Sequence, residues 1–255
     1  MLNSIRLLSV IFLLFISAPS IAKQGRVAII IDDIGYRYSD AKALDLPGNV
    51  TFSILPHTPY GKRLAVKANS HQKDVLLHIP MESEKGQRLG PGALTSDMSE
   101  QTIHDTLAAS FAEIPFAIGI NNHMGSRLTS LYQPMSWTMN FLKKRDLLFL
   151  DSKTSAHSQA EQAARDLGVP INNRHVFLDN NLDDAYIEQQ FNELINHAKS
   201  NEFAIAIAHP HPETVKNLTR LIPRLSKNNI TLVPLSALYR SSTQGNEKVA
   251  LQKTE

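Results

Sequence analysis

Short apolar runs alternate with longer amphipathic stretches along most of the chain. The apolar runs have the length and the β-branched content of buried parallel strands, and they span residues 26–31, 49–55, 74–79, 116–120, 147–150, 175–178, 203–208 and 230–234. Helical periodicity between them predicts helices over residues 60–70, 99–113, 132–145, 158–167, 183–200 and 212–227. Alternation at this spacing indicates βαβ units around a parallel sheet. We therefore expect an α/β fold, an irregular (β/α) barrel of seven or eight mostly parallel strands, with an open doubly wound sheet as the alternative.

The two ends of the chain depart from this pattern. Residues 1–22 carry a single charge, Arg6, followed by a mainly apolar run, and they close with the small residues Ser20 and Ala22. This arrangement is typical of a cleavable export signal, and the run is shorter than the ~20 apolar residues that cross a bilayer as a helix. We expect export to the periplasm, with membrane contact only through this signal; an uncleaved anchor is the alternative. Residues 241–255 form a polar tail, so the globular domain spans residues 23–240.

Composition excludes several classes of protein. The 255 residues are 42% hydrophobic and 20% charged, which is too apolar for a disordered polymer. The formal net charge of +2 lacks the basic excess of a nucleic-acid binder, so we expect no nucleic-acid partner. The chain has no cysteine, which excludes disulfides, thiolate metal sites and a cysteine nucleophile. Any metal site must therefore be built from histidine and carboxylate side chains.

Acidic, basic and imidazole side chains follow five of the apolar runs. They are Asp32 and Asp33 after the first run, His78 and Glu82 at the third, His123 and Arg127 at the fourth, Asp151 at the fifth, and His209 and His211 at the seventh. The carboxyl ends of parallel strands meet at one mouth of an α/β fold, where the connecting loops carry the active site. We therefore expect these side chains to lie close together.

Three of these residues have the chemistry of a metal site. Two adjacent carboxylates repel one another unless a cation or proton separates them, so the pair Asp32 and Asp33 favours a divalent ion. Asp33, His78 and His123 would form an open two-histidine, one-carboxylate site. A helix cap for the aspartates and core positions for the histidines are the alternatives. Asp151 is a further ligand, an acid that orients a histidine, or the start of an Asx turn.

The remaining candidates would act on substrate. His209 is a general acid or base near neutral pH, or otherwise a loop histidine held by its neighbours. His211 lies farther along the same loop and nearer to solvent. Glu82 and Arg127 would position substrate.

Other catalytic signatures are absent from the sequence. It has neither a GxGxxG nor a GxxxxGK[ST] phosphate loop, and neither a GxSxG nor an HExxH motif. A serine triad built on Ser126 stays open. A glycosidase pair of Asp33 with Glu82 or Asp151 also stays open, although it leaves the histidines at the mouth without a role.

The motifs taken together resemble one family. Their order along the chain is DDIG (32–35), HIPME (78–82), NNHMGS (121–126), DSKT (151–154) and AHPHPET (208–214). This set resembles the divergent polysaccharide deacetylase family, a relative of the NodB-type carbohydrate esterases, over residues 25–239. The resemblance implies an irregular (β/α) barrel and metal-dependent removal of N- or O-acetyl groups from polysaccharides.

The resemblance also implies a role for individual residues. Asp32 corresponds to the catalytic base, Asp33 to a metal ligand, and His209 to the acid that protonates the leaving group. The HxxxH pair of the NodB-type relatives is absent, because Glu82 and Arg127 stand where the second histidine would follow. The resemblance then implies one histidine ligand from each of two adjacent strands, His78 and His123.

The expected protein is therefore an exported divalent-metal hydrolase, with zinc as the expected ion. Its expected substrate is an acetylated polysaccharide or oligosaccharide of the cell envelope. The alternative is an inactive deacetylase scaffold that binds a glycan or an envelope partner.

Overall fold

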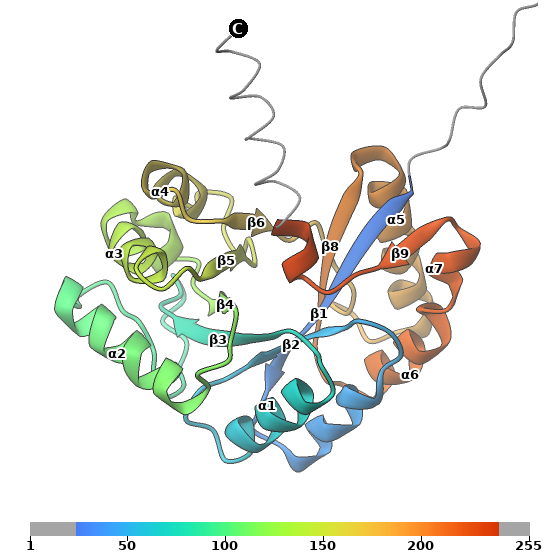
Figure 1. Ribbon diagram of the computed structural model, residues 1–255, viewed down its shortest axis with the longest axis horizontal. Helices are drawn as coiled ribbons and strands as arrows, with labels where there is room; N and C mark the ends of the chain where they lie inside the picture. Colours follow the sequence, from blue (N-terminus) through green and yellow to red (C-terminus); the bar gives the residue numbers. More distant parts are fainter. Residues whose placement is uncertain (1–23, 240–255) are drawn as a thin grey trace, which may run out of the picture.

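A computed structural model describes residues 24–239 as a curled parallel sheet with helices packed around its outside (Figure 1). The strands are β1 (Gly25–Ile34), β2 (Thr51–Ile54), β3 (Val75–Met81), β4 (Gly119–Met124), β5 (Leu148–Asp151), β6 (Ile171–Asn173), β7 (Val176–Phe177), β8 (Phe203–Ala208) and β9 (Ile230–Leu232). The helices are α1 (Gly61–Ser70), α2 (Glu100–Glu113), α3 (Tyr132–Lys143), α4 (Ala160–Leu167), α5 (Asp184–Asn201), α6 (Pro212–Leu221) and α7 (Arg224–Lys227), with 3₁₀ helices η1 (Tyr38–Asp45) and η2 (Leu128–Ser130). The predicted export signal and polar tail lie outside the described residues.

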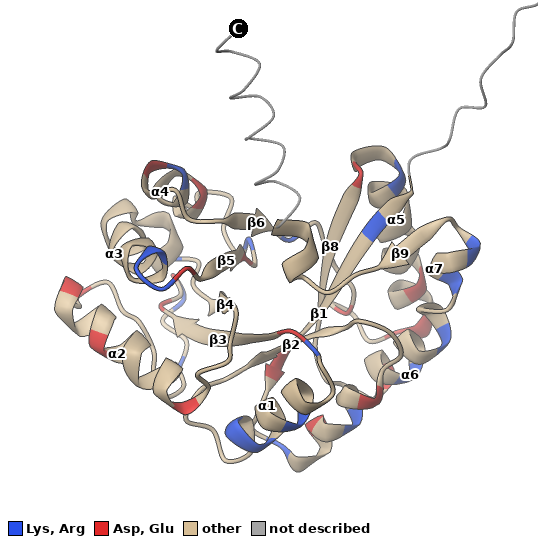
Figure 2. Cartoon of the chain, in the orientation of Figure 1, with Lys and Arg blue, Asp and Glu red and all other residues tan. Residues whose placement is uncertain are grey.

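The order of the strands confirms the expected irregular barrel. The sheet runs β6-β5-β4-β3-β2-β1-β8-β7, β9 pairs with β1, and each of these strand pairings is parallel. Every carboxyl end of a strand therefore faces the same rim. In Figure 2 the charged residues of both signs lie along the outer helices, whereas the strands carry few.

The sequence predicted one strand over residues 175–178, and these bounds are wrong. Two short strands, β6 and β7, lie in this part of the chain, at the two edges of the sheet. β6 pairs with β5 and β7 pairs with β8, so one segment passes from one edge of the sheet to the other. Between the two short strands, the Arg174 amide donates to the Asp151 carbonyl and the His175 amide donates to the Ile205 carbonyl, each at 2.9 Å. Polar residues stand between the two short strands, so the hydrophobic pattern predicted β7 but not β6.

The side chains of β1 alternate between two apolar clusters, which explains why the sequence of this strand is continuously apolar. Val27, Ile29 and Ile31 pack into the larger core cluster, together with apolar residues of the helices. Ala28 and Ile30 point the other way, into a second cluster shared with residues of β3, β5 and β8. Because successive side chains of a strand point to opposite faces, a strand buried on both faces needs apolar residues at every position.

Three further differences from the sequence prediction are local. The predicted helix 212–227 is divided into α6 and α7 just before Pro223, whose ring nitrogen has no hydrogen to donate. The 3₁₀ helix η1 was not predicted. β1 and β4 run farther than predicted, so Asp32, Asp33 and His123 belong to strand ends rather than to loops.

Among residues 24–239, no helix has both the length and the apolar character needed to cross a membrane.

Candidate active site

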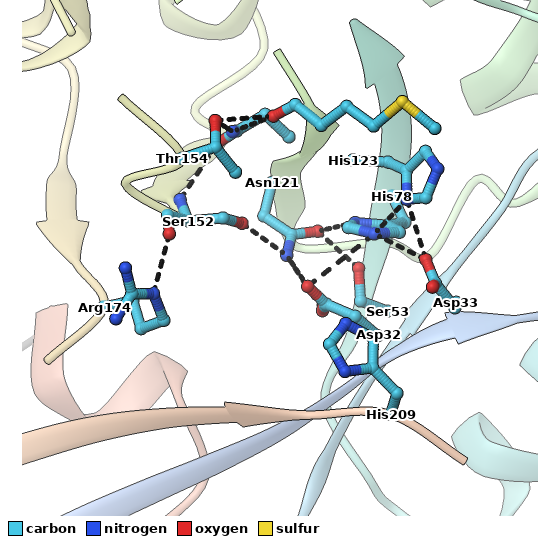
Figure 3. A network of polar contacts seen from close by, with 12 residues as sticks. Asp32, Asp33, Ser53, His78, Asn121, His123, Ser152, Thr154, Arg174 and His209 are labelled. Atoms are coloured by element: carbon cyan, nitrogen blue, oxygen red, sulfur yellow. Dashed lines mark hydrogen bonds and ion pairs between the residues drawn. The ribbon is translucent and has the colours of Figure 1, made fainter. Parts of the chain in front are cut away.

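Asp33, His78 and His123 meet at the carboxyl ends of β1, β3 and β4 (Figure 3). The Asp33 Oδ1 atom lies 3.1 Å from His78 Nε2 and 2.8 Å from His123 Nδ1. The two imidazole nitrogens are 3.2 Å apart. The three residues predicted from separate strands to be metal ligands thus present three donor atoms toward one point.

Strand register explains how these side chains come together. In the parallel pair β3 and β4, His78 lies opposite Asn121, and His123 is two residues beyond Asn121 on the same face. On β1 the register shifts between Ile31 and Ile34, and Asp33 has a φ of 59°. This irregularity departs from strict alternation, so the neighbouring residues Asp32 and Asp33 both approach the histidines.

The donor set fits a divalent ion. Asp33 Oδ1 is a buried oxygen without a hydrogen-bond partner among the described residues, although two imidazole nitrogens lie near it. Nitrogen and oxygen ligands that bind one zinc ion at 2.0–2.2 Å lie about 3.0–3.5 Å from each other, close to the spacing observed here. Burial opposes ionisation of Asp33, but His123 and His78 lower its pKa below its usual value. The carboxylate is therefore ionised and available as a ligand.

Asn121 connects the buried Asp32 to the histidine pair. Its Nδ2 atom donates to Asp32 Oδ1 at 2.9 Å and to Oδ2 at 3.0 Å, and its Oδ1 atom lies 2.8 Å from His78 Nδ1. The Ser53 hydroxyl also donates to Asn121 Oδ1, which fixes the orientation of the amide. Burial raises the pKa of Asp32, against the lowering effects of the nearby His78 and His209.

His209 is held by an acid of its own, Asp179. The His209 Nδ1 atom lies 2.9 Å from Asp179 Oδ1, and the His209 backbone amide donates to Asp179 Oδ2 at 2.7 Å. The Thr214 hydroxyl donates to the same oxygen at 2.8 Å. Burial lowers the pKa of His209, but the bond and charge of Asp179, with smaller contributions from Asp33 and Asp32, raise it to about 9. His209 therefore carries a proton at neutral pH.

A cavity of about 210 Å³ lies over the cluster, and its lining includes Asp33, His123, His209 and His211. Asp32 and His78 are not in this lining, and their side chains are only 3% and 2% exposed. The cavity thus brings Asp33 and His123 together with His209, the predicted acid, while Asp32 lies beneath them.

The remaining predicted residues lie at the margin of the site. Glu82 accepts a hydrogen bond from the Ser96 amide at 2.6 Å and pairs with Arg127 at 2.9 Å, so these two residues contact each other rather than the cluster. Asp151 is fully buried and accepts hydrogen bonds from the Lys153 amide and the Ser158 hydroxyl. Of the three roles predicted for Asp151, this geometry is that of the Asx turn.

Sequence reasoning missed two residues of the site, Asn121 and Asp179. Asn121 lies within the motif that contains His123, but an amide side chain carries no charge that would single it out. Asp179 directly follows the apolar run 175–178. The rule that singled out the other strand ends would have found it.

A comparison with the sequence profiles of known families shows the family to which this chain belongs. The sequence profile of the divergent polysaccharide deacetylases matches residues 29–239, which include every residue of the site. The chain belongs to the divergent polysaccharide deacetylase family. It is 40% identical over 227 residues to the uncharacterised protein YibQ of Escherichia coli K12, covering 89% of this chain and 70% of YibQ. It is 36% identical to an uncharacterised protein of Haemophilus influenzae, covering 89% and 79% of the two chains.

Solved structures support the same fold. An uncharacterised protein of Agrobacterium tumefaciens C58 superposes with a TM-score of 0.81 at 29% identity, covering 86% of this chain and 91% of the other. The catalytic domain of a peptidoglycan N-acetylglucosamine deacetylase from Eubacterium rectale superposes with a TM-score of 0.52 at 16% identity, covering 83% and 88%. A mutant pseudoenzyme of carbohydrate esterase family 4 with restored activity gives 0.53 at 15% identity, covering 86% and 68%.

Proposed function

We propose that this protein is a metal-dependent deacetylase that hydrolyses acetyl groups of a carbohydrate. The observation that carries the proposal is the buried Asp33 Oδ1 atom, which faces two imidazole nitrogens beneath a cavity and has no hydrogen-bond partner among the described residues. The family and the fold of its relatives support the same chemistry. We propose zinc as the ion, because zinc binds histidine nitrogen and carboxylate oxygen and keeps a position open for water or substrate in its catalytic sites.

Each residue of the site has a defined part in this reaction. Asp33, His78 and His123 would hold the ion, and a bound divalent ion would supply Lewis-acid polarisation of the acetyl carbonyl and of water. Asp32 would take the proton of the attacking water, and its raised pKa makes it a stronger base. His209, protonated through Asp179, would give its proton to the departing amine or hydroxyl group of the sugar.

The enclosure of Asp32 favours a second candidate function, binding of a glycan without hydrolysis. Both oxygens of this predicted base accept hydrogen bonds from Asn121, and its side chain is almost wholly buried. A base in this position reaches water only if the amide or the loops above it move. The second candidate would keep the metal and the cavity but release no acetate.

Acetate release distinguishes the two functions. The protein loaded with zinc, cobalt or nickel is incubated with N-acetylated and O-acetylated oligosaccharides, and free acetate is measured. Deacetylation predicts turnover that is lost in both Asp33→Ala and Asp32→Asn, with bound metal retained only in Asp32→Asn. Binding of oligosaccharide without acetate release, with any of the three ions, would support the second candidate and overturn the first.

We propose periplasmic localisation as well, on the export-signal pattern of residues 1–22. Cell fractionation with mass measurement of the purified chain tests this. A periplasmic chain that begins near residue 23 is expected, and a cytoplasmic chain that retains residues 1–22 would contradict it.

A further inference from the structure

A second, larger cavity adjoins the cluster at His123, and His209 does not belong to its lining. Its volume is about 670 Å³, within the roughly 300–1,000 Å³ typical of small-molecule sites. Tyr36, Leu55 and His123 belong to the lining of both cavities, so the two are neighbours across these side chains. Pro80 and residues 88–91 complete the lining of the larger cavity.

The wall formed by residues 88–91 is held in place at its base. The Leu94 amide donates to the Pro80 carbonyl at 2.8 Å, and the Glu82 amide donates to the Leu94 carbonyl at 3.0 Å, which closes the loop between them. Arg127 pairs with the Glu82 side chain below this closure. Glu82 and Arg127 thus hold the base of the loop that carries Arg88.

Tyr36 stands between the two cavities as an aromatic side chain that is 49% exposed. Its hydroxyl group lies so close to Gly90 that a Cβ atom at Gly90 would come within 2.7 Å of it. The ring therefore reaches across from the end of β1 to the opposite loop. Exposed aromatic rings in concave sites offer a flat apolar surface with a polar tip, which suits the apolar face of a sugar ring.

Arg88 supplies the charge of the larger cavity. The ionisable residues in that lining are Arg88, His123 and the Tyr36 phenol, and no acidic residue belongs to it. Arg88 is exposed, and no ion pair or hydrogen bond of its guanidinium group occurs within residues 24–239. A guanidinium group pairs with carboxylate and phosphate oxygens through two parallel hydrogen bonds.

We propose that the larger cavity binds a sugar residue that carries an anionic group, a carboxylate or a phosphate ester, next to the acetylated sugar at the metal cluster. Arg88 pairs with the anion and Tyr36 stacks on the ring. This inference rests on the proposed deacetylase function and gives it a substrate class, an acidic acetylated glycan.

Binding of three oligosaccharides tests the proposal. They have equal length and equal acetylation, and they are neutral, carboxylate-bearing or phosphate-bearing; affinities are measured by calorimetry on the full, metal-loaded protein. Because Arg88 is exposed, its pairing with the anion predicts about two- to five-fold tighter binding of one or both anionic forms than of the neutral form. The carboxylate and phosphate arms show which anion the cavity prefers. Equal affinity for all three oligosaccharides would overturn the proposal.

Variants on the same loop separate this pair from general electrostatic attraction. Arg88→Ala should remove the preference for the anionic form, and Arg88→Lys should keep part of it. Lys85→Ala is the matched control, because it removes the same charge from the same loop. Lys85 lines a different cavity, with Met124, Ser126 and Thr154. Equal loss of preference in Arg88→Ala and Lys85→Ala would overturn the role of Arg88.

Two variants of Tyr36 separate the contribution of its ring from that of its hydroxyl group. Tyr36→Phe should bind all three oligosaccharides as the wild type does, and Tyr36→Ala should weaken all three by a similar factor. Tyr36→Ala with wild-type affinities would overturn the stacking role.

Acetate release from the same samples keeps the two proposals distinct. If acetate is released but the three oligosaccharides bind with equal affinity, the deacetylase stands and the anionic subsite falls. If no acetate is released but the preference persists and depends on Arg88, the subsite stands and the deacetylase falls.

Discussion

The Nδ1 atom of His78 lies 2.8 Å from the Oδ1 atom of Asn121. Because an amide oxygen only accepts hydrogen bonds, Nδ1 of His78 carries a hydrogen, and Nε2 is the ring nitrogen that faces Asp33 and would bind an ion. The same Asn121 side chain donates to both oxygens of Asp32. One amide thus sets the tautomer of a proposed metal ligand and the orientation of the proposed base.

Asn121→Ala should therefore weaken metal binding and destabilise the fold together. Loss of a partner that orients a histidine ligand typically costs 10–100-fold in metal affinity, and we expect a loss of about that size. The buried Asp32 would also lose the amide group that donates to both of its oxygens, which predicts a loss of about 1–3 kcal/mol in the free energy of unfolding. Metal titration and urea denaturation measure the two effects.

Ser53→Ala is the graded control for that variant, since it removes only the hydroxyl group that donates to the Asn121 oxygen. It should shift both quantities in the same direction but by less. Unchanged metal affinity in Asn121→Ala would show that the amide does not set the tautomer of His78.

The pH dependence of stability should report the pairing of His209 with Asp179. The pKa of His209 is raised from 6.5 to about 9 in the folded protein, so the folded state binds the proton more tightly than the unfolded chain. This contribution to stability is complete below about pH 6.5 and is lost as the pH rises through 9. Urea denaturation of metal-free protein from pH 6 to pH 10 would show a decline that Asp179→Asn lacks.

Nuclear magnetic resonance gives a direct reading of the same pair. The His209 ring protons should titrate well above pH 7 in the wild type and at a lower pH in Asp179→Asn. A His209 pKa near 6.5 in both proteins would mean that Asp179 does not hold the proton on the ring.

The sequence predicted the three proposed ligands because each stands at the end of an apolar run. Asp33, His78 and His123 could be placed at one mouth from strand order alone, since parallel strands end at the same rim. The pairing of His209 with Asp179 could not be placed in this way, because it joins residues 30 apart through the register of β7 and β8. Side-chain pairs of this kind depend on tertiary packing rather than on local pattern.

The edges of the fold were the least predictable part for a related reason. Residues 171–173 form a strand although two of the three are asparagines, because they pair along β5 at the edge of the sheet. The side chain of Arg174 donates to the carbonyl oxygens of Ser152 and Lys153 at 2.7 and 3.1 Å, which holds the crossing in place. No periodicity signals a strand that is stabilised in this way.

A glycine in β4 sets the approach of two central strands. A Cβ atom on Gly119 would come within 2.1 Å of the Leu148 carbonyl oxygen, which is backbone and has little freedom to move. Gly119→Ala should therefore separate β4 from β5 and lower the free energy of unfolding by about 1–3 kcal/mol or more. Thermal and urea denaturation measure this loss.

Gly168→Ala is the comparison for that substitution. Gly168 ends α4 with a φ of 72°, and a Cβ atom there would meet nothing within 4 Å. Only the left-handed backbone conformation resists the change, at a cost of about 1–2 kcal/mol. If Gly119→Ala proved as stable as the wild type, the close contact of β4 with β5 would be refuted.

Metal binding should also appear as thermal stability. A ligand that binds only the folded state, at 100 times its dissociation constant, adds about 2.7 kcal/mol to the free energy of unfolding. Zinc should therefore raise the melting temperature of the wild type and leave that of His123→Ala nearly unchanged. Glu82→Gln is the control, because Glu82 contacts Arg127 and Ser96 rather than the cluster, and it should keep the zinc response.

Metal stoichiometry tests the central claim most directly, that Asp33, His78 and His123 form a metal centre. The wild type and the Asp33→Ala, His78→Ala and His123→Ala variants are dialysed against zinc, and the metal bound per chain is measured by mass spectrometry, with circular dichroism to confirm folding. One equivalent in the wild type and far less in each folded variant is the predicted result. No bound zinc in the wild type, or one equivalent retained in all three variants, would contradict it.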